Sequence, residues 1–139
     1  MAEKDYSHRD VVDKLGIRPG DAVAFVGDAA DGGGGLRERV LSRVGRAPAE
    51  ATEPPDVVLA WIDAQTDAEA LLRAWKSRIE PSGGIWLLTP KRSQAGYVDQ
   101  RALIAAGLAA GVVDNKSCSV SDTHSGLRFV IRRADRPRR

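Results

Sequence analysis

Apolar positions along this chain follow two alternating patterns. Three continuous apolar runs are bounded by turn residues, at 22–26, 57–62 and 85–89. Three other stretches place apolar residues at the three- and four-residue spacing of one helix face, at 36–44, 67–79 and 97–110. Continuous runs are typical of buried strands, and spaced runs are typical of amphipathic helices. Their order along the chain predicts repeated βα units around a mostly parallel sheet.

Two segments in the N-terminal half modify this picture. Apolar residues at helical spacing predict a short helix over residues 6–15, with Ser7 as its N-cap. Residues 45–55 contain prolines and few residues that favour strands, so they predict at most a short edge strand. The second βα unit is therefore nearly missing.

The end of the chain has a different pattern. Residues 112–120 and 127–132 are strand-like, and the link at 121–126 is too short for a parallel crossover, so the two strands must be antiparallel. We therefore expect an α/β open sheet, mostly parallel with one antiparallel strand near the edge and helices on both faces. One domain should span residues 1–133, followed by a basic disordered tail at 134–139.

Composition supports a globular domain and excludes several classes. Apolar residues make up 42% of the 139 residues and charged residues 29%, as in ordinary globular proteins. The N-terminus lacks the apolar run of a secretory signal, and no stretch approaches the about 20 apolar residues that span a bilayer, so we expect a cytoplasmic protein without membrane contact. The single cysteine, Cys118, excludes an internal disulfide and a cysteine-rich zinc site.

The basic charge is concentrated at the C-terminus. Residues 132–139 hold five arginines and one aspartate, so the tail carries +4 and the rest of the chain −2. An arginine-rich tail can contact nucleic acid, which leaves a nucleic-acid-associated regulatory protein as one alternative. A solvated terminus is the commoner interpretation, because no aromatic residues lie between these arginines to stack on bases.

Several segments together resemble a known enzyme class. The chain contains, in order, LGIRPGDAVAFVGDA, PPDVVLAWI and WKSRIEPSGGIWLLTPKR, followed by the closing hairpin. This order is similar to the order of landmarks in class I S-adenosylmethionine methyltransferases, including their reversed last strand. The resemblance implies a Rossmann-like, methyltransferase-type open sheet.

A more specific resemblance covers nearly the whole chain, from about residue 12 to 133. The chain is similar to a family of short bacterial proteins known only as domain of unknown function 3052. Three motifs carry this resemblance: IWLLTPK at 85–91, GYV at 96–98 and HSGLR at 124–128. The resemblance implies a fold and no particular activity.

Departures from the methyltransferase pattern weaken the case for a cofactor. Resemblance to those enzymes implies a GxGxG-type turn after the first strand and an acidic residue at the tip of the second strand. Here the first turn begins Gly27-Asp28, and Glu50 and Glu53 are the only candidates for the acidic residue. We therefore expect no cofactor, while S-adenosylmethionine binding by a minimal methyltransferase stays an alternative.

Three polar loops, at 27–35, 89–93 and 121–125, should meet at one rim of the sheet. The reason is that each one leaves a strand at the end of the sheet where the parallel strands have their carboxyl ends. The first loop is a glycine-rich turn before a helix, and with Lys91 and Arg92 opposite it the rim suits a phosphate or carboxylate. A slack surface loop with solvated charges is the competing interpretation. The predicted ligand-binding residues are Gly27, Asp28, Gly32, Gly33, Thr89, Lys91, Arg92, Ser93, Asp122, Thr123, His124 and Ser125.

Catalytic interpretations of these residues are weaker. His124 has hydroxyl and carboxyl neighbours in the sequence, but adjacent residues in a tight turn seldom form a triad, and such turns mainly satisfy their own backbone. Two histidines without metal-ligand spacing do not predict a metal site. The leading hypothesis is a non-catalytic domain that binds a small anionic ligand or a protein partner at the rim.

Overall fold

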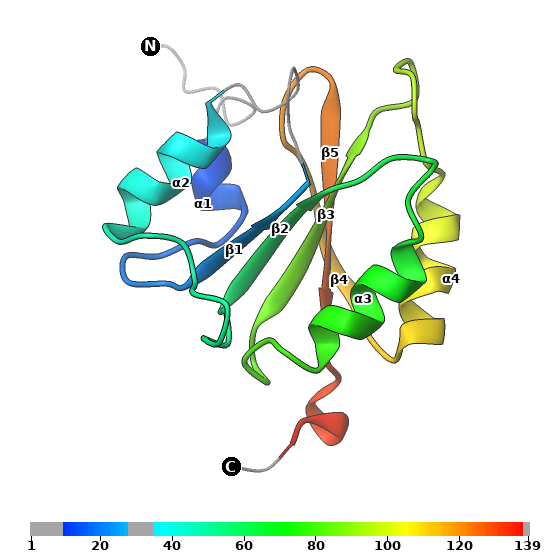
Figure 1. The fold of residues 1–139 in the computed structure, drawn as a ribbon. Coiled ribbons are helices and arrows are strands. Elements are labelled where there is room, and N and C mark those ends of the chain that lie inside the picture. Colours follow the sequence, from blue (N-terminus) through cyan, green and yellow to red (C-terminus); the bar gives the residue numbers. More distant parts are fainter. Residues whose placement is uncertain (1–9, 28–34, 138–139) are drawn as a thin grey trace.

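The computed structural model describes residues 10–27 and 35–137 and has one five-stranded sheet in the order β1-β2-β3-β5-β4 (Figure 1). Its strands are β1 (Val23–Val26), β2 (Val57–Trp61), β3 (Gly84–Pro90), β4 (Val113–Ser119) and β5 (His124–Val130). Its helices are α1 (Val11–Lys14), α2 (Leu36–Val44), α3 (Ala68–Lys76) and α4 (Gln100–Ala110), with a 3-10 turn at Arg133–Asp135.

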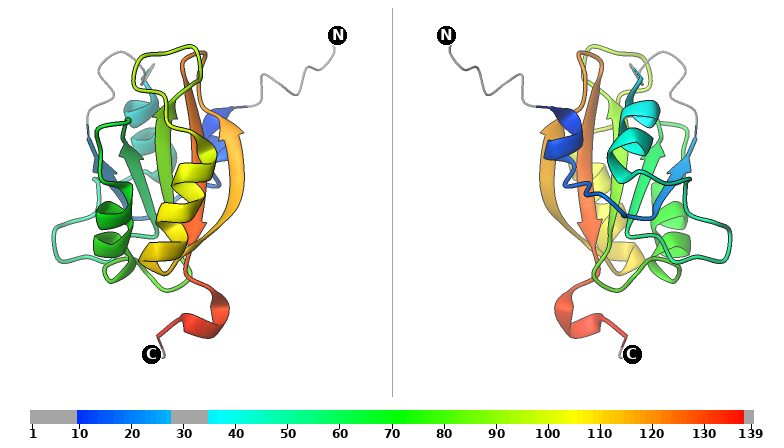
Figure 2. Two further views of the ribbon diagram at one scale, coloured as in Figure 1. Left: turned by 90° about the vertical axis from the view of Figure 1, so that its right-hand side faces the viewer. Right: turned by 90° about the vertical axis from the view of Figure 1, so that its left-hand side faces the viewer.

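Helices cover both faces of the sheet (Figure 2). Apolar side chains of α1 and α2 pack on one face, where Trp86 and Leu59 are buried. Those of α3 and α4 pack on the other face, against Leu87 and Phe129. Because neighbouring residues of a strand point to opposite faces, the continuous apolar runs fill both cores at once. The predicted α/β architecture is confirmed.

One strand runs against the others. The first three strands are parallel to one another, whereas β5 is antiparallel to both β3 and β4. The prediction of a single reversed strand near the edge is therefore confirmed. Since β5 lies inside the sheet, this one strand accounts for two antiparallel pairings.

Aspartates cap the start of two helices. The described part of the first helix starts at Val11, where the Asp10 carboxylate accepts from the backbone N–H of Val12. Ser7, the predicted cap, lies outside the described residues. The helix predicted from residue 97 starts at Gln100, after Asp99 caps it in the same way. Both aspartates have extended backbone, which ends the preceding loop and begins the helix.

Residues 45–56 contain no strand, so β1 is an edge strand of the sheet. The segment makes one backbone contact to β1, from the N–H of Ala49 to the carbonyl of Val23 at 2.8 Å. Its shape is maintained instead by a two-point ion pair of Arg46 with Glu53, at 2.6 and 2.8 Å. Prolines in this segment remove the donors that a strand would need.

Part of the expected C-terminal tail has structure. After β5 the chain forms a 3-10 turn at Arg133–Asp135, and the Arg136 side chain donates to the carbonyl of Ile131 at 3.1 Å. Residues 133–135 therefore form a short turn beyond the end of β5, and the disordered tail at 134–139 stays a prediction, since residues 138–139 lie outside the described ranges. Within the described ranges, no helix combines the length and apolar character that crossing a membrane requires.

Gly107 allows α4 to approach β5, and its substitution tests this packing. A Cβ at Gly107 would collide with the ring of Phe129, which is fully buried. Although alanine favours helices, we expect Gly107→Ala to lower the free energy of unfolding by about 1–3 kcal/mol through overpacking. Urea unfolding followed by circular dichroism measures the change.

Ala105→Gly, on the exposed side of the same helix, is the matched control. It should lower the free energy of unfolding by only about 1 kcal/mol, the difference in helix propensity between alanine and glycine. A stabilised Gly107→Ala protein would contradict the close contact between α4 and β5.

Candidate functional site

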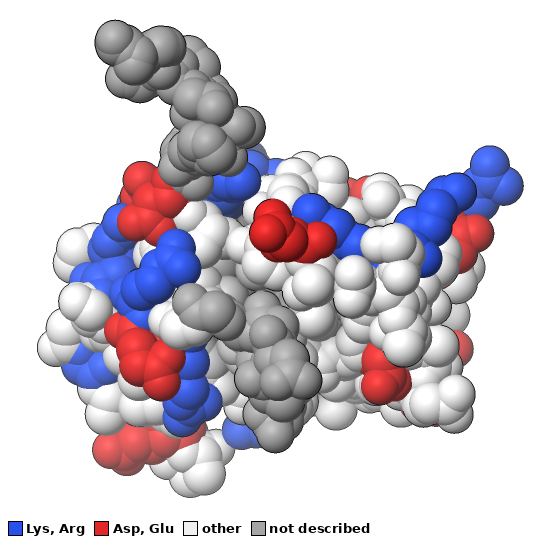
Figure 3. All heavy atoms as spheres, turned by 90° about the horizontal axis from the view of Figure 1, so that it is seen from above, with Lys and Arg blue, Asp and Glu red and all other residues white. Residues whose placement is uncertain are grey.

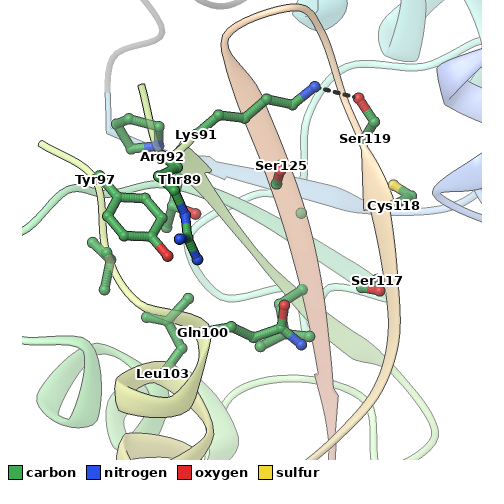
Figure 4. A pocket seen from close by; sticks show the side chains of 14 residues that line it. Thr89, Lys91, Arg92, Tyr97, Gln100, Leu103, Ser117, Cys118, Ser119 and Ser125 are labelled. Carbon is green, nitrogen blue, oxygen red and sulfur yellow. Dashed lines mark hydrogen bonds between the residues drawn. The ribbon is translucent and has the colours of Figure 1, made fainter. Parts of the chain in front are cut away.

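A pocket of about 470 Å³ lies between α4, the loop after β3 and the β4–β5 hairpin (Figure 4). Its floor is the carboxyl end of β3 together with the facing parts of β5 and β4. This volume is within the range of small-molecule sites in proteins. Because β5 is reversed, its amino end and the carboxyl ends of β3 and β4 meet at this edge of the sheet.

Three hydroxyl side chains form a row across the floor. Ser125 of β5 pairs in register with Thr89 of β3 and with Ser119 of β4. Residues directly opposite one another share a face of the sheet, so the three side chains lie on the α4 side. Thr89 is only 5% exposed, and its hydroxyl makes no hydrogen bond to any described residue. This hydroxyl is therefore free to bond with a molecule that occupies the pocket.

Lys91 connects the loop after β3 to the hairpin. Its backbone N–H donates to the carbonyl of Thr123 at 2.8 Å, and its Nζ donates to Oγ of Ser119 at 2.7 Å (Figure 4). Arg92, next along the chain, lies with its guanidinium 5.6 Å from the ring centre of Tyr97. Neither cation has an acidic partner among the described residues, so the pocket carries uncompensated positive charge.

The wall formed by α4 and the residues before it was not predicted from the sequence. Tyr97, Val98 and Leu103 contribute an apolar surface, and Gln100 contributes an amide. Ser117 and Ser119, both in β4, also line the pocket. Their two-residue spacing would have placed the serines on one face of a strand. The sequence has no signal for the direction in which that face points.

The hairpin turn that contains His124 mainly satisfies its own backbone. The hydroxyl of Ser121 accepts hydrogen bonds from the backbone N–H groups of Thr123 and His124, at 3.2 and 3.1 Å. The side chain of Thr123 contacts Nδ1 of His124 at 2.9 Å. Burial lowers the pKa of His124. Neither Thr123 nor His124 lines the pocket, although Ser125, the next residue, does.

Gly27 lies at the end of β1, and β2 separates it from β3, the nearest strand of the pocket. It directly follows β1, and a Cβ at this position would collide with the carbonyl oxygen of Trp61. This close approach, together with its positive φ of 81°, requires glycine at the tip of β1. Asp28, Gly32 and Gly33 lie outside the described residues.

The structure thus brings together only some of the predicted site residues. Thr89, Lys91, Arg92 and Ser125 line one pocket. The other four described residues of the loop and hairpin do not line it: Ser93, Asp122, Thr123 and His124.

The rim has both signs of charge when viewed along the strands from their carboxyl ends (Figure 3). Over α1 and α2, basic and acidic side chains alternate. The surface over α3 and α4 is mostly uncharged, with a few separate charged groups. The visible part of the rim is therefore not a broad basic surface of the kind that binds nucleic acid without sequence preference. Positive charge at the pocket is local.

Comparison with protein families identifies the chain. The model of a family described as "Protein of unknown function (DUF3052)" matches residues 12–133. The chain belongs to this family. Among curated proteins, none matches this sequence.

Solved structures with a similar fold include SAM-dependent methyltransferases. A SAM-dependent methyltransferase from Aquifex aeolicus has a TM-score of 0.64 at 12% identity, covering 87% of this chain and 88% of that one. A putative methyltransferase from Thermoplasma acidophilum has a TM-score of 0.59 at 12% identity, covering 96% of this chain and 77% of that one. Fibrillarin from Aeropyrum pernix, solved with natively bound S-adenosyl-L-methionine, has a TM-score of 0.55 at 12% identity, covering 89% of this chain and 76% of that one. At this identity the likeness shows the fold alone.

The described residues at the tips of β1 and β2 do not by themselves form a methyl-donor site, and residues 28–34 of the first turn lie outside the described ranges. Glu50 and Glu53, the two sequence candidates for a ribose-binding carboxylate, precede β2 and lie at the opposite end of the strands, and Glu53 is paired with Arg46. Asp63 follows β2 at the carboxyl end and is exposed, and Oδ1 of its carboxylate accepts from the N–H of Gln65 and the hydroxyl of Thr66. We therefore derive no chemistry through this cofactor. Nor do the described residues contain a cluster of three metal-ligating side chains.

The lowered pKa of His124 predicts a pH-dependent stability. Because the folded chain resists protonation of this ring, the unfolded chain takes up the proton first as the pH falls through about 6.5. The free energy of unfolding should fall below that pH and be unaffected above it. We expect His124→Gln to reduce the loss between pH 7.5 and 5.5, measured by urea unfolding at both values.

An NMR titration of the ring protons provides a second measurement. It should give a midpoint below 6.5 for His124. A midpoint above 6.5, or an equal loss of stability in the variant, would contradict burial as the controlling effect.

Proposed function

We propose that this protein is a non-catalytic binding domain that holds a small oxyanion, a phosphate or a carboxylate, in the pocket between α4 and the β4–β5 hairpin. The observation that carries the proposal is the hydroxyl of Thr89. Thr89 lines the pocket and is 5% exposed as a residue, and its hydroxyl has no hydrogen-bond partner among the described residues. A free hydroxyl at the floor of a pocket can donate a hydrogen bond to a bound oxygen acceptor in place of water.

Charge in the pocket supports an anion as the ligand. Lys91 and Arg92 are the charged side chains that line the pocket, and no carboxylate lines it with them. Lys91 already has its ammonium directed at Ser119 on the floor, so an anion near the hydroxyl row would meet a preplaced cation. Hydrogen bonds between charged groups are the strong ones in such sites.

Binding is favoured over hydrolysis by what surrounds the hydroxyls. No histidine or carboxylate lines the described pocket, so neither Thr89 nor Ser125 has a general base of that kind. His124 is oriented by Thr123 in the neighbouring turn. The apolar wall with Tyr97 would cover the remainder of a small organic anion.

Titration with inorganic phosphate and with citrate at low salt tests the proposal. Backbone amide shifts in an NMR spectrum should move around residues 89–92 and 125. We expect Thr89→Val and Arg92→Gln each to weaken binding by about fivefold to tenfold, the loss for one hydrogen bond to an anion. Valine keeps the shape of threonine, so Thr89→Val should remain folded.

Arg101→Gln is the matched control, since Arg101 is exposed on α4 and does not line the pocket. Its affinity should equal that of the wild type. Equal affinity in all variants would overturn the proposal. So would tight binding of S-adenosylmethionine that Thr89→Val leaves unchanged, which would favour a minimal methyltransferase.

A further inference from the structure

A second cavity, of about 460 Å³, lies on the α1 face at the opposite end of the sheet. It is formed by the turn after α1, the start of β2 and the facing parts of β4 and β5. Four basic side chains line it: Arg18, Arg43, Lys116 and Arg128. We refer to it as the Arg128 cavity. The rim pocket shares no lining residue with it.

Two of these cations are placed directly opposite one another. Lys116 of β4 is the register partner of Arg128 in β5, and both line the cavity on the same face. The guanidinium of Arg128 lies over Gly84 on the β3 side, and Lys116 is exposed, so the register gives the cavity one cation from each of the two strands.

The guanidinium of Arg128 lies against the backbone of β3. The side chain lies over Gly84 at the start of β3, where a Cβ would collide with the guanidinium nitrogens. Burial lowers the pKa of Arg128, and the nearby charge of Arg136 lowers it further. The guanidinium makes no hydrogen bond or ion pair with any described residue. It is thus a half-buried cation with no counter-charge of its own.

The acidic side chain in the cavity is already used. Asp13 pairs with Arg43 at 2.8 Å, and Arg43 also donates to the carbonyl of Ile17 at 3.0 Å. This leaves the side chains of Arg18, Lys116 and Arg128 without an acidic partner among the described residues. The excess positive charge is gathered in a concave site and not spread over a convex face.

We propose that the Arg128 cavity binds a phosphate group, with Arg128 and Lys116 donating to its oxygens. Guanidinium groups match the geometry of phosphate oxygens with two parallel hydrogen bonds, and a lysine supplies a further donor. The phosphate can belong to a small molecule or to a nucleic-acid backbone, and both sources offer the same chemistry to these side chains.

Trp86 provides a reporter for this site. Its indole N–H donates to the carbonyl of Leu15 at 3.1 Å, and Leu15 lines the Arg128 cavity. Sodium pyrophosphate added at low salt should shift the Trp86 indole signal in an NMR spectrum. The indoles of Trp61 and Trp75, which do not line the cavity, serve as internal references.

We expect Arg128→Gln and Lys116→Gln each to weaken pyrophosphate binding at this reporter at least tenfold. Arg92→Gln, in the rim pocket, and the exposed control Arg101→Gln should leave it unchanged, so failure here is distinct from failure of the rim proposal. Without anion, Arg128→Gln should be at least as stable as the wild type, because it removes an uncompensated cation. If that variant unfolds, the exposed Lys116→Gln carries the test.

A single-stranded oligonucleotide of about 20 residues distinguishes the two sources. Affinity that falls steeply with salt and is lost in both variants would assign the phosphate to nucleic acid, whereas saturable pyrophosphate binding alone would assign it to a small molecule. The proposal is overturned if neither probe binds. It is also overturned if binding survives in Arg128→Gln and Lys116→Gln, or falls equally in Arg92→Gln.

Discussion

The pairing of β5 between β3 and β4 is the interaction on which both candidate sites depend. Its register places Ser125 opposite Thr89 and Ser119, and Arg128 opposite Lys116. Because side chains alternate along a strand, a slip by one residue would exchange the two faces and dismantle both arrangements. Burial of Leu127 and Phe129 on the α4 side prevents this slip. Apolar packing therefore determines where the polar groups are.

Polar groups without partners mark the two ends of this pairing. Near one end, on the α4 face, the hydroxyl of Thr89 has no partner among the described residues and faces a pocket. Toward the other end, on the α1 face, Arg128 holds a partly desolvated charge, and its register partner is Lys116. An anion could accept hydrogen bonds from either group, which is why we propose anions for both sites.

Membership of a family without known function, on a methyltransferase-like fold, does not determine an activity. The same fold supports many functions, and function is decided by the site. In this chain residues 45–56 contain no strand, and their acidic side chain Glu53 is bound to Arg46 at the end of the sheet opposite the rim. The hydroxyl row of the rim pocket and the paired cations of the Arg128 cavity lie instead on β3, β5 and β4. This distribution directs attention to the half of the sheet that contains the reversed strand.

The sequence by itself determined the order of strands and helices, the reversed strand and the two-sided core, because the lengths and spacing of apolar runs are local properties. It also predicted Thr89, Lys91, Arg92 and Ser125 as rim residues, since they lie in the polar segments that follow or precede apolar runs. Only the tertiary structure decided that β2 separates Gly27, at the end of β1, from the pocket over β3, and that Lys116 pairs in register with Arg128. Strand order and register depend on contacts between distant segments, and no local pattern records them.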